Sequence, residues 1–202
     1  MKPVPAEQIT RRALWIAPLG LGAAAVVAVH LRNRRTASLP AAATDTGADR
    51  DVTIAEFDES GTRLGLVRTP RVVHTQSEWR ELLAPRQYLV TRQGHTDPPF
   101  SGTYYRSHAR GLFRCVCCGE ALFSSDDKYD SGTGWPSFRA PAAMENVRTR
   151  REAGIILAIG IEVICARCGA HLGHVFDDGP PPAHLRYCIY ESALRFVPHT
   201  GG

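Results

Sequence analysis

The sequence predicts a mainly β protein with two antiparallel sheets and short N-terminal helices, braced by a metal site and preceded by a hydrophobic helix. Three observations carry this prediction. Short apolar runs separated by Gly, Pro, Asp or Ser fill the second half of the chain, which is typical of antiparallel sheets in a sandwich or an open barrel. Two Cys-x-x-Cys-Gly units lie far apart, at Cys115/Cys118 and Cys165/Cys168. Residues 13–31 contain no Lys, Arg, Asp or Glu.

The composition is that of an ordinary globular protein. The chain has 202 residues, of which 44% are hydrophobic and 22% charged, and this length suits one domain with an extension. The net charge of +4 comes from residues 1–50, because residues 51–202 hold seventeen Lys/Arg and seventeen Asp/Glu. The folded part therefore lacks the basic excess that binds a phosphate backbone, and we expect no nucleic-acid partner.

The apolar segment at residues 13–31 would form a helix about 28 Å long, close to the ~30 Å hydrocarbon core of a membrane. The sequence Thr-Arg-Arg-Ala-Leu before it resembles a twin-arginine export signal. We interpret residues 1–35 as a membrane anchor or export signal, with a buried core helix as the alternative. This places the protein in the cell envelope, with the periplasmic side favoured over the cytoplasm. Residues 36–50 are small, polar and proline-containing, which is typical of a linker.

A hairpin and two short helices are expected next. Val52–Phe57 and Leu64–Arg68 flank a turn sequence, which predicts a hairpin within an extension of residues 51–76. Ser77 is expected to cap a short helix that runs through Leu83. The predicted apolar face of that helix consists of Trp79, Leu82 and Leu83.

The second helix is expected to open at Pro85 and to end at Gly94. Beyond it the pattern becomes β, and residues 77–199 are expected to form one domain. The predicted strands are Gly102–Arg106, Leu112–Cys115, Ala121–Ser124, Ile155–Cys165, Leu172–Phe176, Leu185–Ile189 and Ala193–Val197.

The four paired cysteines, Cys115, Cys118, Cys165 and Cys168, have the spacing of metal ligands. Two thiolates three residues apart can hold one ion around a tight turn, for which the following glycine supplies a left-handed conformation. Four thiolates leave no open coordination position, so we expect one structural Zn²⁺ per chain that clamps distant parts of the domain. Two redox dithiols or ordinary buried cysteines are the alternatives. Cys117 is a competing ligand that lies outside the repeated register.

Cys188 lies outside the two paired units and is the candidate for a catalytic cysteine. Arg186 lies two residues before it, on the same face of a strand, where a cation would lower the pKa of the thiol and favour the nucleophilic thiolate. His171 and His174 would face opposite sides of a strand unless Gly173 kinks the chain. A buried core thiol beside structural histidines is the alternative, and spacing alone leaves both interpretations open.

Four motifs carry a family resemblance. They are GTGWPSF (Gly132–Phe138), CARCGAHLGHVFDDGP (Cys165–Pro180), RYCI (Arg186–Ile189) and LRF (Leu194–Phe196). Together they closely resemble the methionine-R-sulfoxide reductases, the MsrB family, over a stretch from about Ser77 to Pro198. The resemblance implies the MsrB-like β fold and the thiol-dependent reduction of L-methionine-(R)-sulfoxide in proteins. This would be a repair function under oxidative stress, with thioredoxin or a similar thiol as the electron donor.

The resemblance also implies roles for individual residues. Cys188 matches the family nucleophile, which becomes a sulfenic acid. His171 and His174 match the histidines that hold and protonate the sulfoxide oxygen. Arg186 would support the thiolate, and Trp135 matches the wall of the pocket for the S-methyl group.

The chain departs from the family at two positions. Thr133 stands where many members carry a cysteine that attacks the sulfenic acid, so an outside thiol or Cys117 would have to serve instead. Tyr190 stands where the family has asparagine, which changes the hydrogen-bonding groups near the histidines. A non-catalytic, membrane-tethered zinc-ribbon interaction module is the alternative function.

Overall fold

The computed structural model describes residues 50–150 and 160–199. The predicted N-terminal hydrophobic helix, nearly all of the linker and the start of the predicted Ile155–Cys165 strand lie outside the described residues. Within these two ranges, no helix has both the length and the apolar character that a membrane crossing requires.

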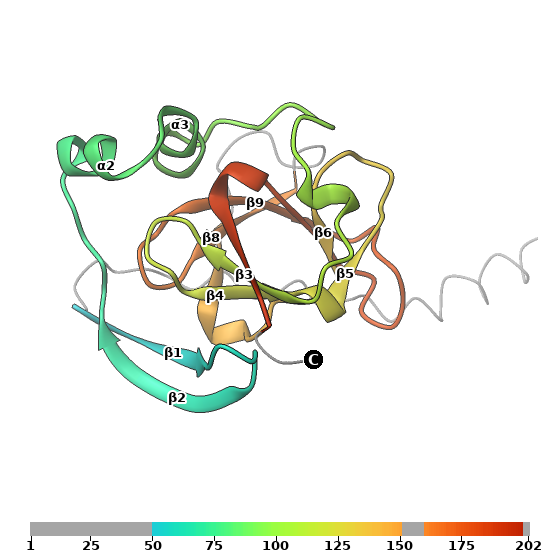
Figure 1. Ribbon diagram of the computed structural model, residues 1–202, viewed down its shortest axis with the longest axis horizontal. Helices are drawn as coiled ribbons and strands as arrows, with labels where there is room; N and C mark the ends of the chain where they lie inside the picture. The colour runs from blue at the N-terminus through green and yellow to red at the C-terminus, as the bar shows by residue number, and fades with distance from the viewer. Residues whose placement is uncertain (1–49, 151–159, 200–202) are drawn as a thin grey trace, which may run out of the picture. The chain divides into compact units, whose positions relative to one another are not determined.

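Antiparallel sheets form the architecture (Figure 1). A hairpin pairs β1 (Asp51–Phe57) with β2 (Arg63–Pro70). The largest sheet has the strand order β5 (Lys128–Tyr129), β6 (Ser137–Phe138), β10 (Arg186–Ile189), β9 (His171–Phe176), β8 (Ile161–Cys165) and β7 (Val147–Arg150). A third sheet has the order β11 (Leu194–Pro198), β3 (Gly111–Cys115) and β4 (Ala121–Ser124). The predicted mainly β fold is thus confirmed.

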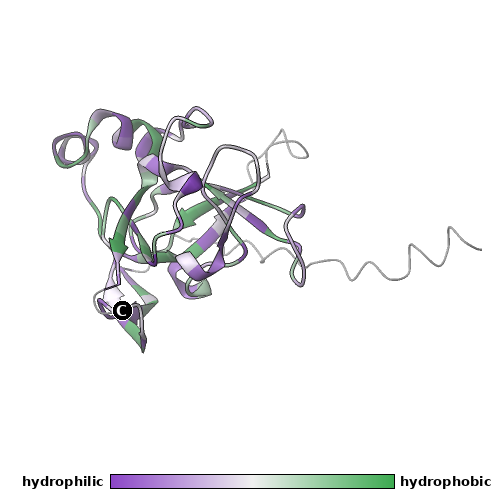
Figure 2. Cartoon of the chain, turned by 45° about the vertical axis from the view of Figure 1, so that its right-hand side comes forward, coloured by the Kyte–Doolittle hydropathy of each residue, from purple (hydrophilic) through white to green (hydrophobic). Residues whose placement is uncertain are grey.

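Aromatic side chains join the six-stranded sheet to the three-stranded sheet. Phe138 of β6 stacks on Phe123 of β4 with ring centroids 4.5 Å apart, and Phe113 of β3 meets it edge-on at 5.1 Å. Tyr187 of β10 lies 5.8 Å from Phe123, and all four side chains are buried. Each buried ring contributes about 1.5–3 kcal/mol relative to exposure. The strands accordingly carry most of the apolar colour in Figure 2.

The first helix, α2 (Gln76–Leu82), begins at a different cap from the predicted one. The Thr75 hydroxyl accepts the backbone N–H of Glu78, and the Glu78 carboxylate accepts the backbone N–H of Thr75 at 2.6 Å. This reciprocal capping box satisfies two N–H groups, whereas a cap at Ser77 would satisfy one, so that prediction was wrong. Trp79 is buried, but Leu82 is 62% exposed and does not belong to the apolar face.

The second helix, α3 (Pro85–Gln93), has the predicted boundaries. Pro85 occupies its first turn, and Gly94 ends it with a φ of 70°, which is the left-handed conformation of a helix C-cap. Val90 of this helix is fully buried in the main core. The helix contacts β9 and the 3-10 turn η4 (Glu191–Ala193), so it lies against the strand that carries both histidines.

The predicted strand Gly102–Arg106 is wrong, because this segment contains the 3-10 turn η1 (Tyr104–Arg106). The Glu191 carboxylate accepts the backbone N–H groups of Thr103 and Tyr104 at 2.6 and 2.7 Å. A side chain therefore takes the place that a neighbouring strand would have. Strands β5, β6 and β7 had no predicted counterpart, since the first two have only two residues each and β7 is polar.

The N-terminal hairpin packs against the rest of the domain through Asn146 of η3 (Met144–Asn146). The Asn146 side-chain oxygen accepts the backbone N–H of Ala55 at 2.7 Å, and its amide donates to the Ala55 carbonyl at 2.9 Å. A second amide hydrogen reaches the carbonyl of Ala121 in β4 at 2.8 Å. Because Asn146 is fully buried, these three bonds tie β1 firmly to β4.

Candidate functional site

The two Cys-x-x-Cys-Gly units fold into matching turns. The N–H of Gly119 donates to the carbonyl of Cys115, and the N–H of Gly169 donates to the carbonyl of Cys165, both at 2.9 Å. The two glycines have φ angles of 78° and 68°, which are left-handed values that residues with a Cβ rarely adopt. The turns lie at the ends of β3 and β8, so the sheets bring together segments that are distant in sequence.

The four sulfur atoms of these turns converge. Their Sγ atoms all lie within 4.8 Å of one another. The Sγ atoms of Cys115 and Cys168 are 3.7 Å apart, and those of Cys118 and Cys165 are 3.6 Å apart. A disulfide would need about 2.05 Å, whereas a tetrahedral ion with bonds of about 2.3 Å would separate its sulfur ligands by about 3.8 Å. The cluster therefore fits one tetrahedral metal ion better than it fits two disulfides.

Cys188 lies on β10, between β6 and β9. Its Cα partner on β9 is His174, so the two side chains project from the same face of the sheet. Arg186, two residues earlier on the strand, faces the same way, and Arg186 and Thr133, from the turn before β6, both act to lower the pKa of the Cys188 thiol. Cys188 is 6% exposed, so its sulfur lies at the bottom of the site.

The environment of Cys188 differs from the expectation that a nearby cation lowers the pKa of its thiol. Burial raises the pKa of Cys188 and outweighs the opposite effects of Arg186 and Thr133. The Arg186 guanidinium makes two hydrogen bonds of 2.8 Å to the Asp178 carboxylate, which partly neutralises its charge. The resting thiol is consequently protonated near neutral pH.

Gly173 brings the two histidines together. Its φ of 145° kinks β9, and the register with β8 shifts at this point. A Cβ at this position would collide with the carbonyl oxygen of Cys188, so β9 and β10 can approach only at a glycine. The rings of His171 and His174 come within 5.4 Å of each other, which the kink hypothesis anticipated.

Glu162 on β8 holds His171. The His171 Nδ1 lies 2.8 Å from a Glu162 carboxylate oxygen, and both side chains are buried. Burial raises the pKa of the Glu162 carboxyl, but hydrogen bonds from His171 and Arg150 lower it further, and the net pKa is below the ordinary value. An ionised carboxylate only accepts, so Nδ1 carries the proton. The sequence contained a signal for this residue, since Glu162 is the one acid in the predicted Ile155–Cys165 strand.

The other ring nitrogen of His171 points to the chemistry of the site. Nε2 is buried, and no residue in the described part of the chain hydrogen-bonds it. An unpaired buried donor or acceptor costs about 1–3 kcal/mol, so a ligand that pairs with Nε2 gains this amount on binding. Nε2, once it is protonated, is therefore free to donate a hydrogen bond to an oxygen atom of a bound substrate.

Trp135 stands at the edge of the same site. Its Nε1–H donates to the carbonyl oxygen of Asp97 at 2.9 Å, which fixes the orientation of the indole. The buried Asp97 carboxylate is itself held by Arg86 at 2.8 Å and by the backbone N–H and hydroxyl of Ser192, both at 2.9 Å. No pattern in the sequence singles out Asp97, because its partners come from opposite ends of the domain.

Comparison with known proteins is consistent with this geometry. The family model for the SelR domain matches residues 83–198, more than half of the chain. The chain belongs to the SelR (MsrB) family. It is 50% identical over 130 residues to the peptide methionine sulfoxide reductase MsrB of Herminiimonas arsenicoxydans, covering 63% of this chain and 93% of that protein.

Other relatives come from distant lineages. The MsrB of Methanosarcina barkeri is 47% identical over 131 residues, covering 65% of this chain and 92% of that protein. The chloroplastic peptide methionine sulfoxide reductase B1 of Arabidopsis thaliana is 49% identical over 121 residues, covering 60% of this chain and 59% of that protein. The motifs that suggested the MsrB family thus identified it correctly.

Tyr190, which departs from the usual MsrB motif, lies among the aromatic groups of the site. Its ring centroid is 5.6 Å from that of His171 and 6.5 Å from that of Trp135. Its hydroxyl lies 3.4 Å from His174 Nδ1 and 3.1 Å from the Thr96 hydroxyl. Tyrosine therefore still contacts a site histidine, through a hydroxyl in place of an amide.

Thr133, the second departure, lies near enough to Cys188 to lower the pKa of its thiol. Its hydroxyl is 2.8 Å from that of Ser131, which is in turn 2.8 Å from that of Ser137, the Cα partner of Cys188. Cys117 has different neighbours, since Cys115 and Cys168 are the groups that most lower the pKa of its thiol. Cys117 therefore lies beside the cluster of four cysteines, while a chain of hydroxyl groups lies on the Cys188 side of the site.

The raised pKa of Cys188 predicts how its reactivity depends on pH. Only the thiolate reacts with iodoacetamide, so the alkylation rate should rise about tenfold per pH unit from pH 7 to 9. Mass spectrometry of the peptide that contains Cys188 measures this rate separately from the other cysteines. In Arg186→Met, which lacks the lowering effect of the cation, the rise should shift to higher pH. A plateau below pH 7 in the unchanged protein would contradict the prediction.

Proposed function

We propose that this chain reduces L-methionine-(R)-sulfoxide in oxidised proteins, with Cys188 as the nucleophile. One observation carries the proposal: a buried thiol faces His174 and lies beside a His171–Glu162 pair, next to an oriented indole. A thiol, a proton donor and an apolar wall are the groups that sulfoxide reduction needs. The family membership supports the same reaction.

The reaction begins when the Cys188 thiol, protonated at rest, gives its proton to an imidazole of the site, and the resulting thiolate attacks the sulfoxide sulfur. The attack forms a bond between the two sulfur atoms while an imidazolium donates a proton to the sulfoxide oxygen. The resulting hydroxyl group then passes from the substrate sulfur to the cysteine sulfur, so the substrate S–O bond and the S–S bond both break and Cys188 becomes a sulfenic acid. Methionine leaves with two more electrons than the sulfoxide had. His171 is the better placed donor, because Glu162 stabilises its positive charge and Nε2 is unpaired among the described residues.

A separate thiol then restores Cys188. One external thiol condenses with the sulfenic acid to give a mixed disulfide and water, and a second thiol releases the reduced cysteine. Thr133 cannot form a disulfide, and Cys117 lies with the metal ligands, which favours thioredoxin or a similar dithiol as the donor. Such a donor supplies both thiols from one molecule.

We also propose that the metal is a single structural zinc ion held by Cys115, Cys118, Cys165 and Cys168. Four thiolates with sulfur separations near those of a tetrahedron suit zinc, and they leave no position for a substrate. The ion would add structural stability and take no part in the reaction.

The location proposed for the enzyme is the cell envelope, with residues 1–35 as the anchor or export signal. The apolar segment at 13–31 and its flanking arginines support this proposal. Fractionation of cells that express the full chain or a chain lacking residues 1–35 tests it. The full chain should sediment with membranes or appear outside the cytoplasm, and equal distribution of both chains would refute it.

The decisive experiment for the function uses separated sulfoxide epimers of a short peptide, with dithiothreitol as reductant. We expect turnover of the R epimer and at least about 100-fold slower turnover of the S epimer, because the two are handled by different enzymes. No turnover of either epimer by metal-loaded protein would leave the interaction-module interpretation in its place.

Replacement of Glu162 by glutamine is expected to lower kcat about 10- to 100-fold with little change in KM, because a neutral amide at this position can no longer stabilise a protonated His171. Nitrogen-15 NMR of His171 should show a single Nδ1–H tautomer in the unchanged protein and a mixture in the variant. Glu162→Asp, which keeps the charge, should retain more activity than Glu162→Gln. Equal losses in both variants, with an unchanged His171 spectrum, would assign Glu162 a packing role only.

A further inference from the structure

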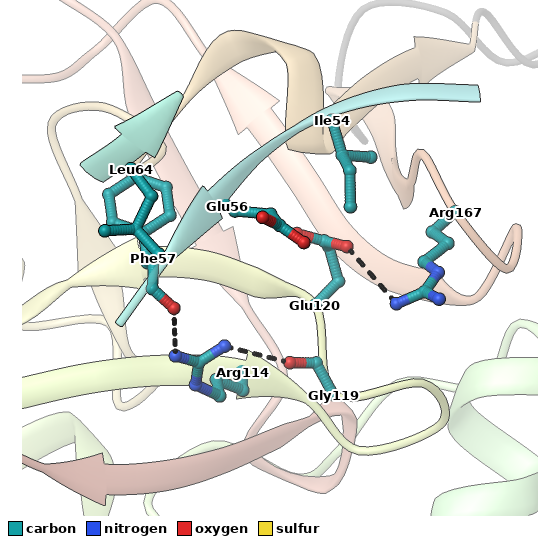
Figure 3. Close-up of a pocket in the computed structure, with 8 residues that line it drawn as sticks. All are labelled: Ile54, Glu56, Phe57, Leu64, Arg114, Gly119, Glu120 and Arg167. Atoms are coloured by element: carbon teal, nitrogen blue, oxygen red, sulfur yellow. Dashed lines mark hydrogen bonds and ion pairs between the residues drawn. The ribbon is translucent and has the colours of Figure 1, made fainter. Parts of the chain in front are cut away.

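Two hollows in the described residues lie outside the Cys188 site, and their charges differ. The first, of about 250 Å³, lies beneath β1 and is lined by the carboxylates of Glu56 and Glu120 and by the guanidinium groups of Arg114 and Arg167 (Figure 3). Arg114 donates to backbone carbonyl groups there, and Arg167 approaches Glu120 at 4.0 Å. The lining of this hollow therefore carries charges of both signs.

The second hollow, of about 230 Å³, is strongly basic. It lies between the segment after β2, the two helices and the second metal-binding turn, and it is lined by Arg71, His74, Arg92 and Arg167 around Trp79. None of the described residues that line it carries a carboxylate. Its His74 and Arg167 side chains also approach carboxylates outside the hollow, His74 toward Glu78 at 3.9 Å and Arg167 toward Glu120 at 4.0 Å.

Neutral groups orient Arg92, one of the cations of this hollow. Arg92 Nη1 donates to the carbonyl oxygen of Cys168 at 3.0 Å, and its guanidinium lies 4.7 Å from the centre of the buried Trp79 ring. His74 meets the same ring edge-on at 4.6 Å, and Arg71 Nη1 donates to the Ala166 carbonyl at 3.1 Å. The carbonyl group and the indole hold the Arg92 cation in place without cancelling its charge, so little ordering of Arg92 is needed when an anion binds.

Three residues that line the hollow also have buried N–H donors that lack a hydrogen-bond acceptor among the described residues. Arg92 Nε, Arg167 Nε and Trp79 Nε1 are buried, and no residue in the described ranges accepts a hydrogen bond from them. Each such donor costs about 1–3 kcal/mol while it is unpaired. An acceptor-rich ligand that reaches them would recover part of that cost.

We propose that this hollow is a binding site for an oxyanion, namely a phosphate or carboxylate group. Guanidinium groups present parallel N–H donors that match two oxygens of either group. The volume holds several water molecules at about 30 Å³ each, and therefore one tetrahedral or planar oxyanion with part of the molecule attached to it. The site is separate from Cys188, since none of its lining residues belongs to β6, β9 or β10.

The metal cluster offers a competing explanation for these arginines. Four thiolates around Zn²⁺ carry a net charge of −2, which cations near Cys168 would partly neutralise. If this were their only role, removal of an arginine would weaken metal retention, and added anions would not compete for the hollow. Anion affinity and metal content are therefore the two quantities to separate.

The test places a competing carboxylate in the hollow. Val73 lines it and is 79% exposed, so Val73→Glu and its neutral control Val73→Gln should both fold normally. Isothermal titration calorimetry of the metal-loaded full chain in neutral detergent, at constant ionic strength, measures inorganic phosphate binding. We expect a Kd below about 10 mM for the unchanged protein, at least about tenfold weaker binding in Val73→Glu, and a change below about twofold in Val73→Gln.

Arginine variants and a second ligand complete the design. Arg92→Gln should lose affinity for phosphate about tenfold, whereas Arg110→Gln, an exposed arginine outside the hollow, should not. Competition by a glutamate-rich peptide that binds more tightly than phosphate would identify a protein-borne carboxylate as the ligand, and binding of phosphate alone would identify a free phosphate compound. Absence of binding by both, equal behaviour of the two Val73 variants, or an Arg110→Gln effect as large as that of Arg92→Gln would overturn the proposal.

Discussion

Replacement of Cys188 by serine is expected to lower turnover of the R sulfoxide at least about 10³-fold. The hydroxyl of serine is nearly the same size as the thiol, but its pKa is far too high to supply a nucleophile here, and no other described cysteine lies beside His174. The measurement is the rate of methionine formation with dithiothreitol as reductant. A dimedone-type reagent should also label Cys188 after sulfoxide treatment of the unchanged protein and label nothing at position 188 in the variant.

Cys117→Ala is the matched control for this experiment. Cys117 is a partly exposed thiol whose neighbours are metal ligands, so its loss should leave turnover within about twofold when dithiothreitol is the reductant. If Cys188→Ser retained turnover and Cys117→Ala lost it, the nucleophile would have been assigned to the wrong cysteine. Unchanged circular dichroism and metal content in both variants would exclude misfolding as the cause of a loss.

Loss of the metal is expected to produce the largest change in stability. Structural zinc sites supply about 10–16 kcal/mol in zinc-finger peptides, as much as the whole free energy of unfolding of a typical domain. The four ligands also join β3 to β8, which belong to different sheets. Removal of the ion by a chelator should therefore lower the Tm by at least about 10 °C or unfold the domain.

Cys165→Ala should reproduce the effect of chelation, because three thiolates cannot complete the tetrahedron. Cys117→Ala again serves as the control, since this residue lies outside the cluster of four, and it should retain one metal ion and nearly the original Tm. Calorimetric melting with metal analysis of the same samples measures both. Metal-free protein that melts at the original temperature would refute the structural role of the ion.

Much of the fold followed from local sequence signals. Gly94 ends α3 because its left-handed conformation needs no neighbour outside the helix, and the glycines after the cysteine pairs form turns for the same reason. The sequence predicts a cap at Ser77, but α2 is capped at Thr75. Thr75 and Glu78 each accept the backbone N–H of the other, and these two hydrogen bonds stabilise the helix start more than a single cap would. The segment at residues 102–106 was misassigned because a carboxylate 88 residues away binds its backbone.

Positions in the site differed in how far they could be foreseen. Gly173 was identified as a possible kink, since a glycine between two histidines in a strand has few other roles. The effect of Arg186 on Cys188 was only half foreseen, because sequence proximity supplies the cation but not the burial or the Asp178 carboxylate. Asp97 was missed entirely, as its four hydrogen bonds to Trp135, Arg86 and Ser192 cross the domain.

The sequence by itself determined the family, and it singled out the four cysteines that the fold brings together and the cysteine that we propose as the nucleophile, because short motifs with fixed spacing carry that information. Only the tertiary structure decided which groups surround that cysteine and with what charge. Glu162 reaches His171 only because β8 pairs with β9 through a shifted register. Protonation and orientation depend on burial and on contacts between distant strands, and neither quantity is encoded in any local stretch of the chain.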